Sequence, residues 1–239
     1  MDAGRAQKYA RIAGILIFVS AAAGGFGESY VPHTLLIAND LAGTVHKVAA
    51  SVGLFRASFA AYLVEAACDL TLTVLFYALL RPVSRTLSLL AACFGIFSTA
   101  IFAVGEIFYF VAALPAVDAH VARVIPPDAQ ATLTYLGLTI FGYVFAIFAA
   151  FYGVTQMVRG FLIFRSGYLP RVLGVILAIG GLSFVVFNFF TVLAPQYNPP
   201  YVIAPMMLAM VCMMLWLLVK GVDRTRWDEM QARETATGN

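Results

Sequence analysis

Long hydrophobic stretches separated by short polar connections run through the whole chain. Each stretch holds about 18 or more residues with few charges, the length that an α-helix needs to cross the hydrocarbon core of a membrane. The pattern predicts six membrane-spanning helices, with approximate bounds at residues 9–27, 57–80, 86–114, 131–158, 172–194 and 201–219. No connection is long enough to separate two domains. We therefore expect an all-α, polytopic six-helix bundle that forms one integral membrane domain over residues 1–239.

The composition excludes a water-soluble protein. Hydrophobic residues make up 62% of the 239 and charged residues 11%, whereas soluble domains carry about 25% charged residues. The net charge of +3 is small, and no dense basic run suggests a nucleic-acid partner. The expected partners are the lipid bilayer, a small molecule or cation, and another membrane protein. No phosphate loop, haem-attachment motif or nucleophile elbow is present in the sequence, so no cofactor is predicted.

Basic residues gather on one side of the predicted bundle. The two ends of the chain and the second and fourth connections hold twelve Lys and Arg residues, whereas the opposite connections hold three. The twelve are Arg5, Lys8, Arg11, Arg81, Arg85, Arg159, Arg165, Arg171, Lys220, Arg224, Arg226 and Arg233, and the three are Lys47, Arg56 and Arg123. Because positive residues gather on the cytoplasmic side of membranes, we expect a multi-pass protein of the inner (plasma) membrane with both termini in the cytoplasm.

The first hydrophobic stretch has a second interpretation. Its basic start, the run "IAGILIFVS" and the small residues "AAAGG" also resemble a secretory signal peptide. Ala21 and Gly25 stand four residues apart, a spacing that lets membrane helices approach closely, and this favours a retained spanning helix.

The first outer connection, residues 31–56, carries a periodic pattern of its own. Several apolar side chains fall on one helical face and two charged side chains on another. The apolar set is Leu41, Val45, Val48 and Val52, and the charged pair is Asp40 and Lys47. The pattern predicts an amphipathic helix that lies at the outer membrane interface and covers the bundle there.

Polar residues interrupt three of the hydrophobic stretches at similar depths. Counted from the outer helix ends at 1.5 Å per residue, Glu65 lies about 12 Å deep and Asp69 about 18 Å deep. On the same count, Glu106 lies about 12 Å deep and Asn188 roughly 10 Å deep. We expect these groups to share a layer in the outer half of the membrane.

The faces of the helices agree with the depths. Polar side chains recur every three or four residues in the second, third and fourth stretches, which places them in stripes. The stripes are Tyr62, Glu65, Asp69, Thr73 and Tyr77; Thr99, Glu106 and Tyr109; and Thr132, Tyr135, Thr139 and Tyr143. Because a charge at the bilayer centre costs about 2.5–3.5 kcal/mol, the stripes are expected to face one another rather than lipid. Glu65 and Asp69 have no basic residue on the same turns, so at least one is expected to be neutral unless a cation binds.

These positions predict a polar pocket inside the membrane, open to the outer side. The candidate residues are Glu65, Asp69, Glu106, Asn188, Arg56, Thr139, Tyr62 and Tyr109. Arg56 is expected at the interface, within reach of Glu106 or Glu28. A metal site built from His33 and His46 fits no recognised ligand spacing, so no metal is predicted.

Three functions stay open on this sequence. The leading hypothesis is that the pocket binds a small ligand, a lipid, a cation or a proton, with transport as its extension. The first alternative is a membrane-embedded enzyme that uses a buried carboxyl group as a general acid. The second alternative is an accessory or assembly subunit, in which the acids only hydrogen-bond neighbouring helices at about 0.6 kcal/mol per contact.

Three blocks of sequence resemble a known family. They are "GLFRASFAAYLVEAACDLTLTVLFYALLRPVSRTLSLLAA", "FLIFRSGYLPRVLGVILAIGGLSF" and "LWLLVKGV". In these blocks the chain is similar to the bacterial membrane proteins grouped as domain of unknown function 4386. The resemblance implies a six-helix membrane protein and no assigned activity. The recurring pattern of the family falls on Leu54, Phe55, Arg56, Asp69, Leu79, Leu80, Arg81, Pro82 and Val83.

The chain departs from the implied family pattern at two positions. The resemblance implies that relatives often carry a histidine where this chain has Thr155, and a glutamate where it has Met210. Asp69 is therefore the best-matched acid inside the membrane, and the departures weaken the expectation of chemistry shared across the family.

Overall fold

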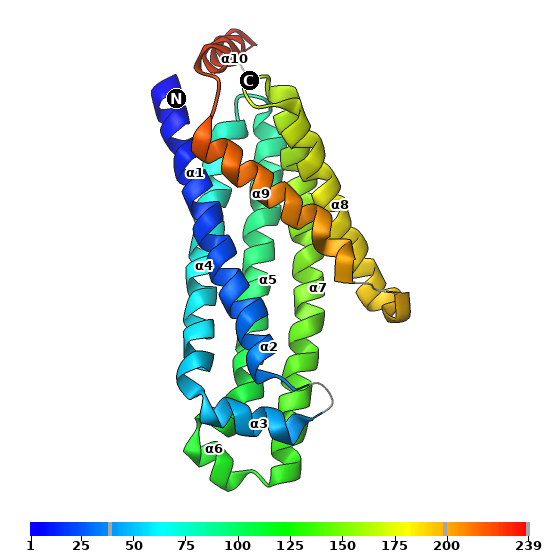
Figure 1. Cartoon of the computed structure of the whole chain (residues 1–239). Coiled ribbons are helices and arrows are strands. Elements are labelled where there is room, and N and C mark those ends of the chain that lie inside the picture. The colour runs from blue at the N-terminus through cyan, green and yellow to red at the C-terminus, as the bar shows by residue number, and fades with distance from the viewer. Residues whose placement is uncertain (38–39, 198–199, 238–239) are drawn as a thin grey trace. The chain divides into compact units, whose positions relative to one another are not determined.

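The computed structural model describes residues 1–37, 40–197 and 200–237, and helices make up most of this part of the chain (Figure 1). Six helices are long and apolar enough to cross a membrane, which confirms the predicted all-α, six-helix class. Their bounds are Ala3–Leu35, Val52–Leu80, Arg85–Val117, Pro127–Ser166, Arg171–Leu193 and Tyr201–Val219. No β-strand occurs in the described residues.

The first spanning helix changes its hydrogen-bond register near its outer end. It consists of α1 (Ala3–Gly24), a π-helical segment η1 (Gly25–Tyr30) and α2 (Val31–Leu35). π-Helical turns inside α-helices are rare and frequently occur at functional sites. The hydrophobic pattern of the sequence does not predict this segment.

The remaining elements follow in chain order. They are α3 (Leu41–Ala50), α4 (Val52–Leu80), α5 (Arg85–Val117), α6 (Ala119–Val124), α7 (Pro127–Ser166), α8 (Arg171–Leu193), the 3-10 turns η2 (Pro195–Tyr197) and η3 (Pro200–Ile203), α9 (Ala204–Val219) and α10 (Arg224–Thr237). The middle of the last predicted outer turn, residues 198–199, lies outside the described residues.

Helix α7 is longer than the sequence predicts. It spans 40 residues and continues beyond the expected end at residue 158, through Arg159 to Ser166. Gly167, with a φ of +74°, follows the last helical residue and allows the chain to turn. The interpretation of Arg159 as part of a polar connection is therefore wrong.

The chain divides into two compact units. Unit 1 comprises Met1–Phe18, Cys68–Thr99 and Ala146–Asn239, and unit 2 comprises Val19–Ala67 and Ala100–Phe145. Helices α1, α4, α5 and α7 contribute residues to both units. The expectation of one integral domain stays a prediction.

Two pairs of glycines bring α7 and α8 together in unit 1. A Cβ atom on Gly160 would lie 2.6 Å from the carbonyl oxygen of Gly174, and one on Gly153 would lie 2.5 Å from that of Gly181. The pairs are seven residues apart in both helices, at 153 and 160 and at 174 and 181, so they recur on one face every two turns. Small residues at this spacing let membrane helices pack backbone to backbone.

Both ends of the chain meet at one end of unit 1. The indole of Trp227, which has no exposed surface, donates a hydrogen bond of 3.1 Å to the carbonyl oxygen of Met1. The amide of Gln7 donates to the carbonyl oxygen of Lys220 and accepts from the backbone N–H of Val222, both at 2.9 Å. This arrangement agrees with an even number of membrane crossings between the two ends.

Unit 2 contains the helix predicted for the first outer connection. This helix is α3, and the Asp40 side chain caps it by accepting a hydrogen bond of 2.8 Å from the backbone N–H of Gly43. Thr44 and Val48 point inward and are buried. The amphipathic helix is thus present, and its position at the membrane interface stays a prediction.

A short helix, α6, follows the third spanning helix in unit 2. The carboxyl group of Asp118 accepts hydrogen bonds from the backbone N–H groups of Val121 and His120, at 3.2 Å and 2.8 Å. These bonds favour the ionised form and hold the pKa of Asp118 below its usual value.

Candidate functional site

The predicted polar residues belong to two groups, one in each unit. In unit 2, Glu28, Glu65 and Glu106 lie within electrostatic range of Tyr62, and we call these four residues the acidic cluster. In unit 1, Asp69 lines a cavity together with Arg159, and we call it the ion-pair cavity because these two residues carry opposite charges.

Three elements supply the acidic cluster. Glu28 comes from the π-helical segment η1, Tyr62 and Glu65 come from α4, and Glu106 comes from α5. The phenol of Tyr62 interacts electrostatically with all three carboxyl groups. Tyr62 is 1% exposed and Glu106 is 5% exposed, so the centre of the cluster is shielded from bulk solvent.

Glu106 has an unusual environment for a carboxyl group. Neither of its oxygens has a hydrogen-bond partner among the described residues, and the hydroxyls of Tyr62 and Tyr109 have none either. The Tyr62 phenol and the Glu106 carboxyl lie close enough to interact, but they do not meet the geometry of a direct hydrogen bond. A buried polar group without a partner costs about 1–3 kcal/mol, and more when it is charged. Glu106 is therefore expected to hold a proton or to contact bound water.

Glu65 packs directly on the backbone of the first spanning helix. A Cβ atom on Gly24 would lie 2.8 Å from Oε1 of Glu65. Any larger residue at position 24 would displace this carboxyl group, so Gly24 makes room for the acid. The sequence pattern indicated Ala21 and Gly25 as small contact residues and did not identify Gly24.

Aromatic packing fixes the two tyrosine rings of unit 2. The ring centroids of Tyr62 and Tyr109 are 5.9 Å apart, with an interplanar angle of 65°. Tyr62 also lies 5.6 Å from Phe102, and Tyr109 lies 5.2 Å from Phe55. Edge-to-face and offset arrangements of this kind stabilise aromatic pairs and hold both hydroxyls in place.

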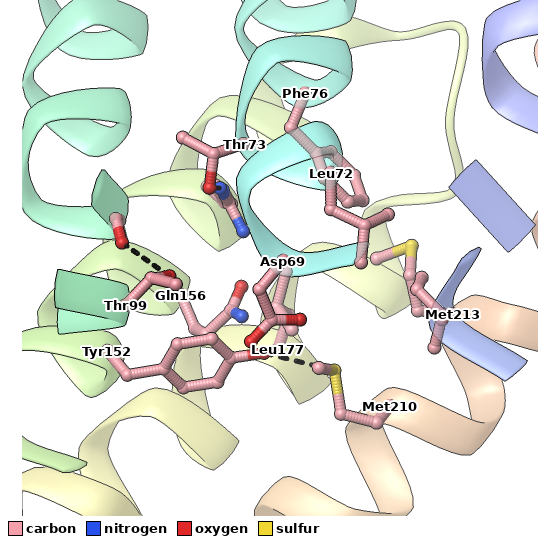
Figure 2. Close-up of a pocket in the computed structure, with 13 residues that line it drawn as sticks. Asp69, Leu72, Thr73, Phe76, Thr99, Tyr152, Gln156, Leu177, Met210 and Met213 are labelled. Carbon is pink, nitrogen blue, oxygen red and sulfur yellow. Dashed lines mark hydrogen bonds between the residues drawn. The ribbon is translucent and has the colours of Figure 1, made fainter. Parts of the chain in front are cut away.

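The ion-pair cavity lies between helices of unit 1 (Figure 2). The centre of a water molecule can move through about 20 Å³ of it, which is room for one or two waters. Its polar lining consists of Asp69, Thr73, Thr99, Tyr152, Gln156 and Arg159. In Figure 2 the carboxyl group of Asp69, the amide of Gln156 and the ring of Tyr152 point toward one another.

Arg159 is buried in this cavity wall with 4% of its surface exposed. Its Nη2 donates a hydrogen bond of 3.1 Å to the hydroxyl of Thr73, and its guanidinium carbon lies 4.9 Å from the ring centroid of Phe76. Asp69 attracts it electrostatically. A Cβ atom on Gly95 would lie 3.3 Å from Nη2, so this glycine leaves space for the guanidinium group.

Arg159 lines the same cavity as Asp69, and the sequence does not predict this basic residue near the acid. No basic residue falls on the same turns of the helix, and for this reason the sequence predicts that at least one of Glu65 and Asp69 is neutral unless a cation binds. Because α7 continues past residue 158, it places Arg159 in the wall of the cavity that Asp69 also lines, and Asp69 attracts it electrostatically. Asp69 thus has a positive neighbour, which the linear sequence does not reveal.

Asn188 forms a contact between helices of unit 1. Its amide donates a hydrogen bond of 2.6 Å to the carbonyl oxygen of Ala146, and the side chain is half-buried. This is the kind of contact that the structural interpretation of buried polar residues predicts.

The predicted inward stripe of the fourth spanning helix is wrong for two tyrosines. Tyr135 is 56% exposed and Tyr143 is 54% exposed. Small residues take the inward face instead, because a Cβ atom on Gly137 would lie 2.7 Å from the Cβ of Ala112. Thr139 is half-buried.

The other predicted site residues lie at the periphery of unit 2. Arg56 is exposed near the start of α4. His33 and His46 are exposed, and Nδ1 of His33 lies 2.8 Å from the carbonyl oxygen of Ser29. Within the described ranges, no three or more His, Cys, Asp or Glu side chains come together in a way that would hold a metal ion.

Of the two positions that depart from the implied family pattern, Met210 lines the ion-pair cavity and Thr155 is buried in α7. The sulfur of Met210 accepts a hydrogen bond of 3.9 Å from the Tyr152 hydroxyl. Thr155 has no exposed surface, and its hydroxyl donates to the carbonyl oxygen of Phe151 at 3.0 Å.

Six helices that are long and apolar enough to cross a membrane define a multi-pass membrane protein. The chain belongs to the family described as domain of unknown function 4386, whose model matches residues 12–221, and this confirms the resemblance seen in the sequence. The chain is 28% identical over 158 residues to an uncharacterized protein of Archaeoglobus fulgidus, covering 64% of this chain and 76% of that protein. No solved structure matches the chain.

Proposed function

We propose that the protein binds and releases a proton at the acidic cluster, and that it uses this proton in transport across the membrane. One observation carries the proposal: Glu106 is 5% exposed, and neither of its oxygens has a hydrogen-bond partner in the described part of the chain. Its charged neighbour Glu28 is another acid, so a proton is the simplest group that makes Glu106 neutral.

The small size of a neighbouring cavity favours a proton or water over an organic ligand or a lipid. This cavity of unit 2 is lined by Tyr109, whose ring packs on that of Tyr62, and by residues of α3, and the centre of a water molecule can move through about 10 Å³ of it. This volume suits about one water molecule. Its walls are mostly apolar, with Val48, Ala113 and Leu138 among them.

The phenol of Tyr62 gives the cluster a means of moving the proton. A phenol both donates and accepts hydrogen bonds, and Tyr62 interacts with the carboxyl groups of Glu28, Glu65 and Glu106. A small rotation of one side chain would let Tyr62 donate to an ionised carboxylate on one side while it accepts from a protonated carboxyl group on the other. Chains of acids inside membrane bundles serve as proton relays in pumps and transporters.

The proposed orientation places the protein in the inner (plasma) membrane with both termini in the cytoplasm. The distribution of Lys and Arg along the chain supports this orientation. The hydrogen bond from Trp227 to Met1 supports it further, because it keeps the two ends of unit 1 together. In this orientation the acidic cluster belongs to the outer half of the membrane.

Labelling with dicyclohexylcarbodiimide tests the proton site. This apolar reagent attacks protonated carboxyl groups inside membranes, and mass spectrometry of peptides locates the adduct. We expect an adduct on Glu106 that decreases as the pH is raised, that excess sodium chloride does not reduce, and that Glu106→Gln abolishes. The exposed Glu229 of α10 is the matched control and should stay unlabelled. Absence of the adduct from Glu106, or protection by sodium, would overturn the proposal.

A transport measurement separates proton transfer from a static proton. The protein is reconstituted into vesicles that contain a pH-sensitive dye, and a pH gradient is imposed across the vesicle membrane. We expect the gradient to decay faster with the wild-type protein than with Glu106→Gln. Equal decay for the two proteins across a panel of co-solutes would leave proton binding without transport and contradict the transport part of the proposal.

A further inference from the structure

We propose that the ion-pair cavity of unit 1 is a water-binding site, in which one or two ordered water molecules bridge Asp69, Arg159 and Gln156. The inference is independent of the proton site, because it rests on different residues in the other unit. The water would hydrate two residues of opposite charge that line one cavity among apolar helices.

The lining of the cavity fits water in its chemistry. A bound water typically makes about three hydrogen bonds, with a range of 2–4, to polar groups of the protein. The cavity offers a carboxyl group, a guanidinium group and an amide, together with the hydroxyls of Thr99 and Tyr152. Its accessible volume of about 20 Å³ holds one or two waters.

The side chain of Gln156 provides a second observation in favour of bound water. Its side chain is 3% exposed and belongs to the polar lining of the cavity. A side-chain amide carries two donor hydrogens and one acceptor oxygen. Because buried polar groups nearly always have a partner in protein or ordered water, the amide of Gln156 points to water in the cavity. Figure 2 shows this amide directed toward Asp69.

The guanidinium group of Arg159 would donate hydrogen bonds to the same water. A guanidinium group has five N–H donors, and Thr73 accepts from one nitrogen at 3.1 Å. The ring of Phe76 covers one face of the group and offers it no oxygen. Water on the cavity side would satisfy further donors and reduce the cost of holding a charge at this depth.

X-ray radiolysis of the full-length protein in detergent tests the site. Hydroxyl radicals form from water under the beam and oxidise side chains next to bound water, methionine among the fastest. Met210 and Met213 of α9 line the cavity. Met206 lies in the same helix, has no exposed surface and is not part of the lining, so it is a matched internal control. We expect several-fold faster oxidation at Met210 and Met213 than at Met206, and equal rates at all three would overturn the proposal.

A pair of variants tests the role of the amide. Gln156→Leu keeps a similar volume and removes the hydrogen-bonding group, so oxidation of Met210 should fall toward the rate of Met206. Thr155→Val is the control, because Thr155 is its neighbour in α7 and its hydroxyl bonds within the same helix. An unchanged Met210 rate in Gln156→Leu would contradict the assignment of Gln156 as a water ligand. The comparison among the three methionines of the wild-type chain decides the main proposal even where a variant fails to fold.

Discussion

Arg159 of α7 donates a hydrogen bond of 3.1 Å to Thr73 of α4, and Asp69 lies one helical turn from Thr73 in the same helix. The guanidinium group therefore contacts a polar stripe of α4 rather than the solvent outside the membrane. A charge buried in this way is expensive unless it is paired and hydrogen-bonded. The hydrogen bond to Thr73 and the electrostatic attraction of Asp69 offset part of this cost.

Removing either of these two opposite charges should destabilise the protein. Arg159→Leu removes the charge that attracts Asp69 and the hydrogen bond to Thr73, and Asp69→Asn removes the charge that attracts Arg159, so each is expected to lower the free energy of unfolding by about 1–3 kcal/mol. The double variant Asp69→Asn/Arg159→Leu should lose less than the sum of the single losses, because neither charge is then left alone. Thermal unfolding in detergent measures the three effects.

A control variant tests whether the loss of stability is specific to the buried Arg159 or follows from the removal of any arginine charge. Arg165 lies in the same helix but is exposed, so Arg165→Leu should change stability by about 0.5 kcal/mol or less. Additive losses in the double variant would show that Asp69 and Arg159 do not stabilise one another.

Neutralising Glu106 should have little effect on stability. If Glu106 is protonated in the folded protein, Glu106→Gln replaces a neutral carboxyl group with an amide of the same shape, and the free energy of unfolding should change by about 1 kcal/mol or less. The midpoint of thermal unfolding, measured at neutral pH, checks this expectation. A loss comparable to that of Arg159→Leu would mean that Glu106 is ionised and has a partner that stabilises its charge.

Close packing of α7 on α8 makes Gly160 intolerant of a side chain. A Cβ atom there would lie 2.6 Å from the carbonyl oxygen of Gly174 and 2.7 Å from the backbone nitrogen of Ala178. Backbone atoms cannot move aside as the end of a flexible side chain can, so Gly160→Ala is expected to cost about 1–3 kcal/mol. A Cβ atom on Gly142 of the same helix would meet no described atom within 4 Å, so Gly142→Ala should be neutral or slightly stabilising. Equal unfolding temperatures of the two variants would contradict this account of the interface.

The class of fold could be predicted from the sequence because it depends on local properties. Length and hydrophobicity of each stretch determine whether a helix can span the membrane, and neither requires knowledge of the neighbouring helices. Helix α3 is also predictable from a local property, the periodic apolar face of its sequence. The end of α7 is not predictable in this way, because a charged residue such as Arg159 is typical of the membrane boundary. Burial of a charge depends on its partner, and the partner lies on another helix.

The sequence predicts which residue types belong to the candidate site, but it predicts less well which of these residues lie together. Glu65, Glu106, Tyr62 and Tyr109 were chosen from depth and helical face, and the structure places all four in unit 2. Gly24 was missed as the contact of Glu65, because which small residue faces an acid depends on the rotation of one helix against another. The segment η1 was missed because a change of hydrogen-bond register leaves the hydrophobic pattern unchanged.

Gln7 should control how firmly the C-terminal helix α10 is held. Its amide bonds both Lys220 and Val222, the residues that lead into α10, and it is 8% exposed. Gln7→Leu removes both hydrogen bonds and leaves a buried backbone N–H and a carbonyl without this partner, at a cost of about 1–3 kcal/mol each. We expect faster tryptic cleavage after Arg224 and Arg226 in Gln7→Leu than in the wild type, followed by gel electrophoresis. Lys8→Gln, which changes an exposed neighbour, should leave the cleavage rate at these two sites unchanged. If Gln7→Leu is cleaved no faster than Lys8→Gln, then Trp227 and its bond to Met1 hold the helix without help from Gln7.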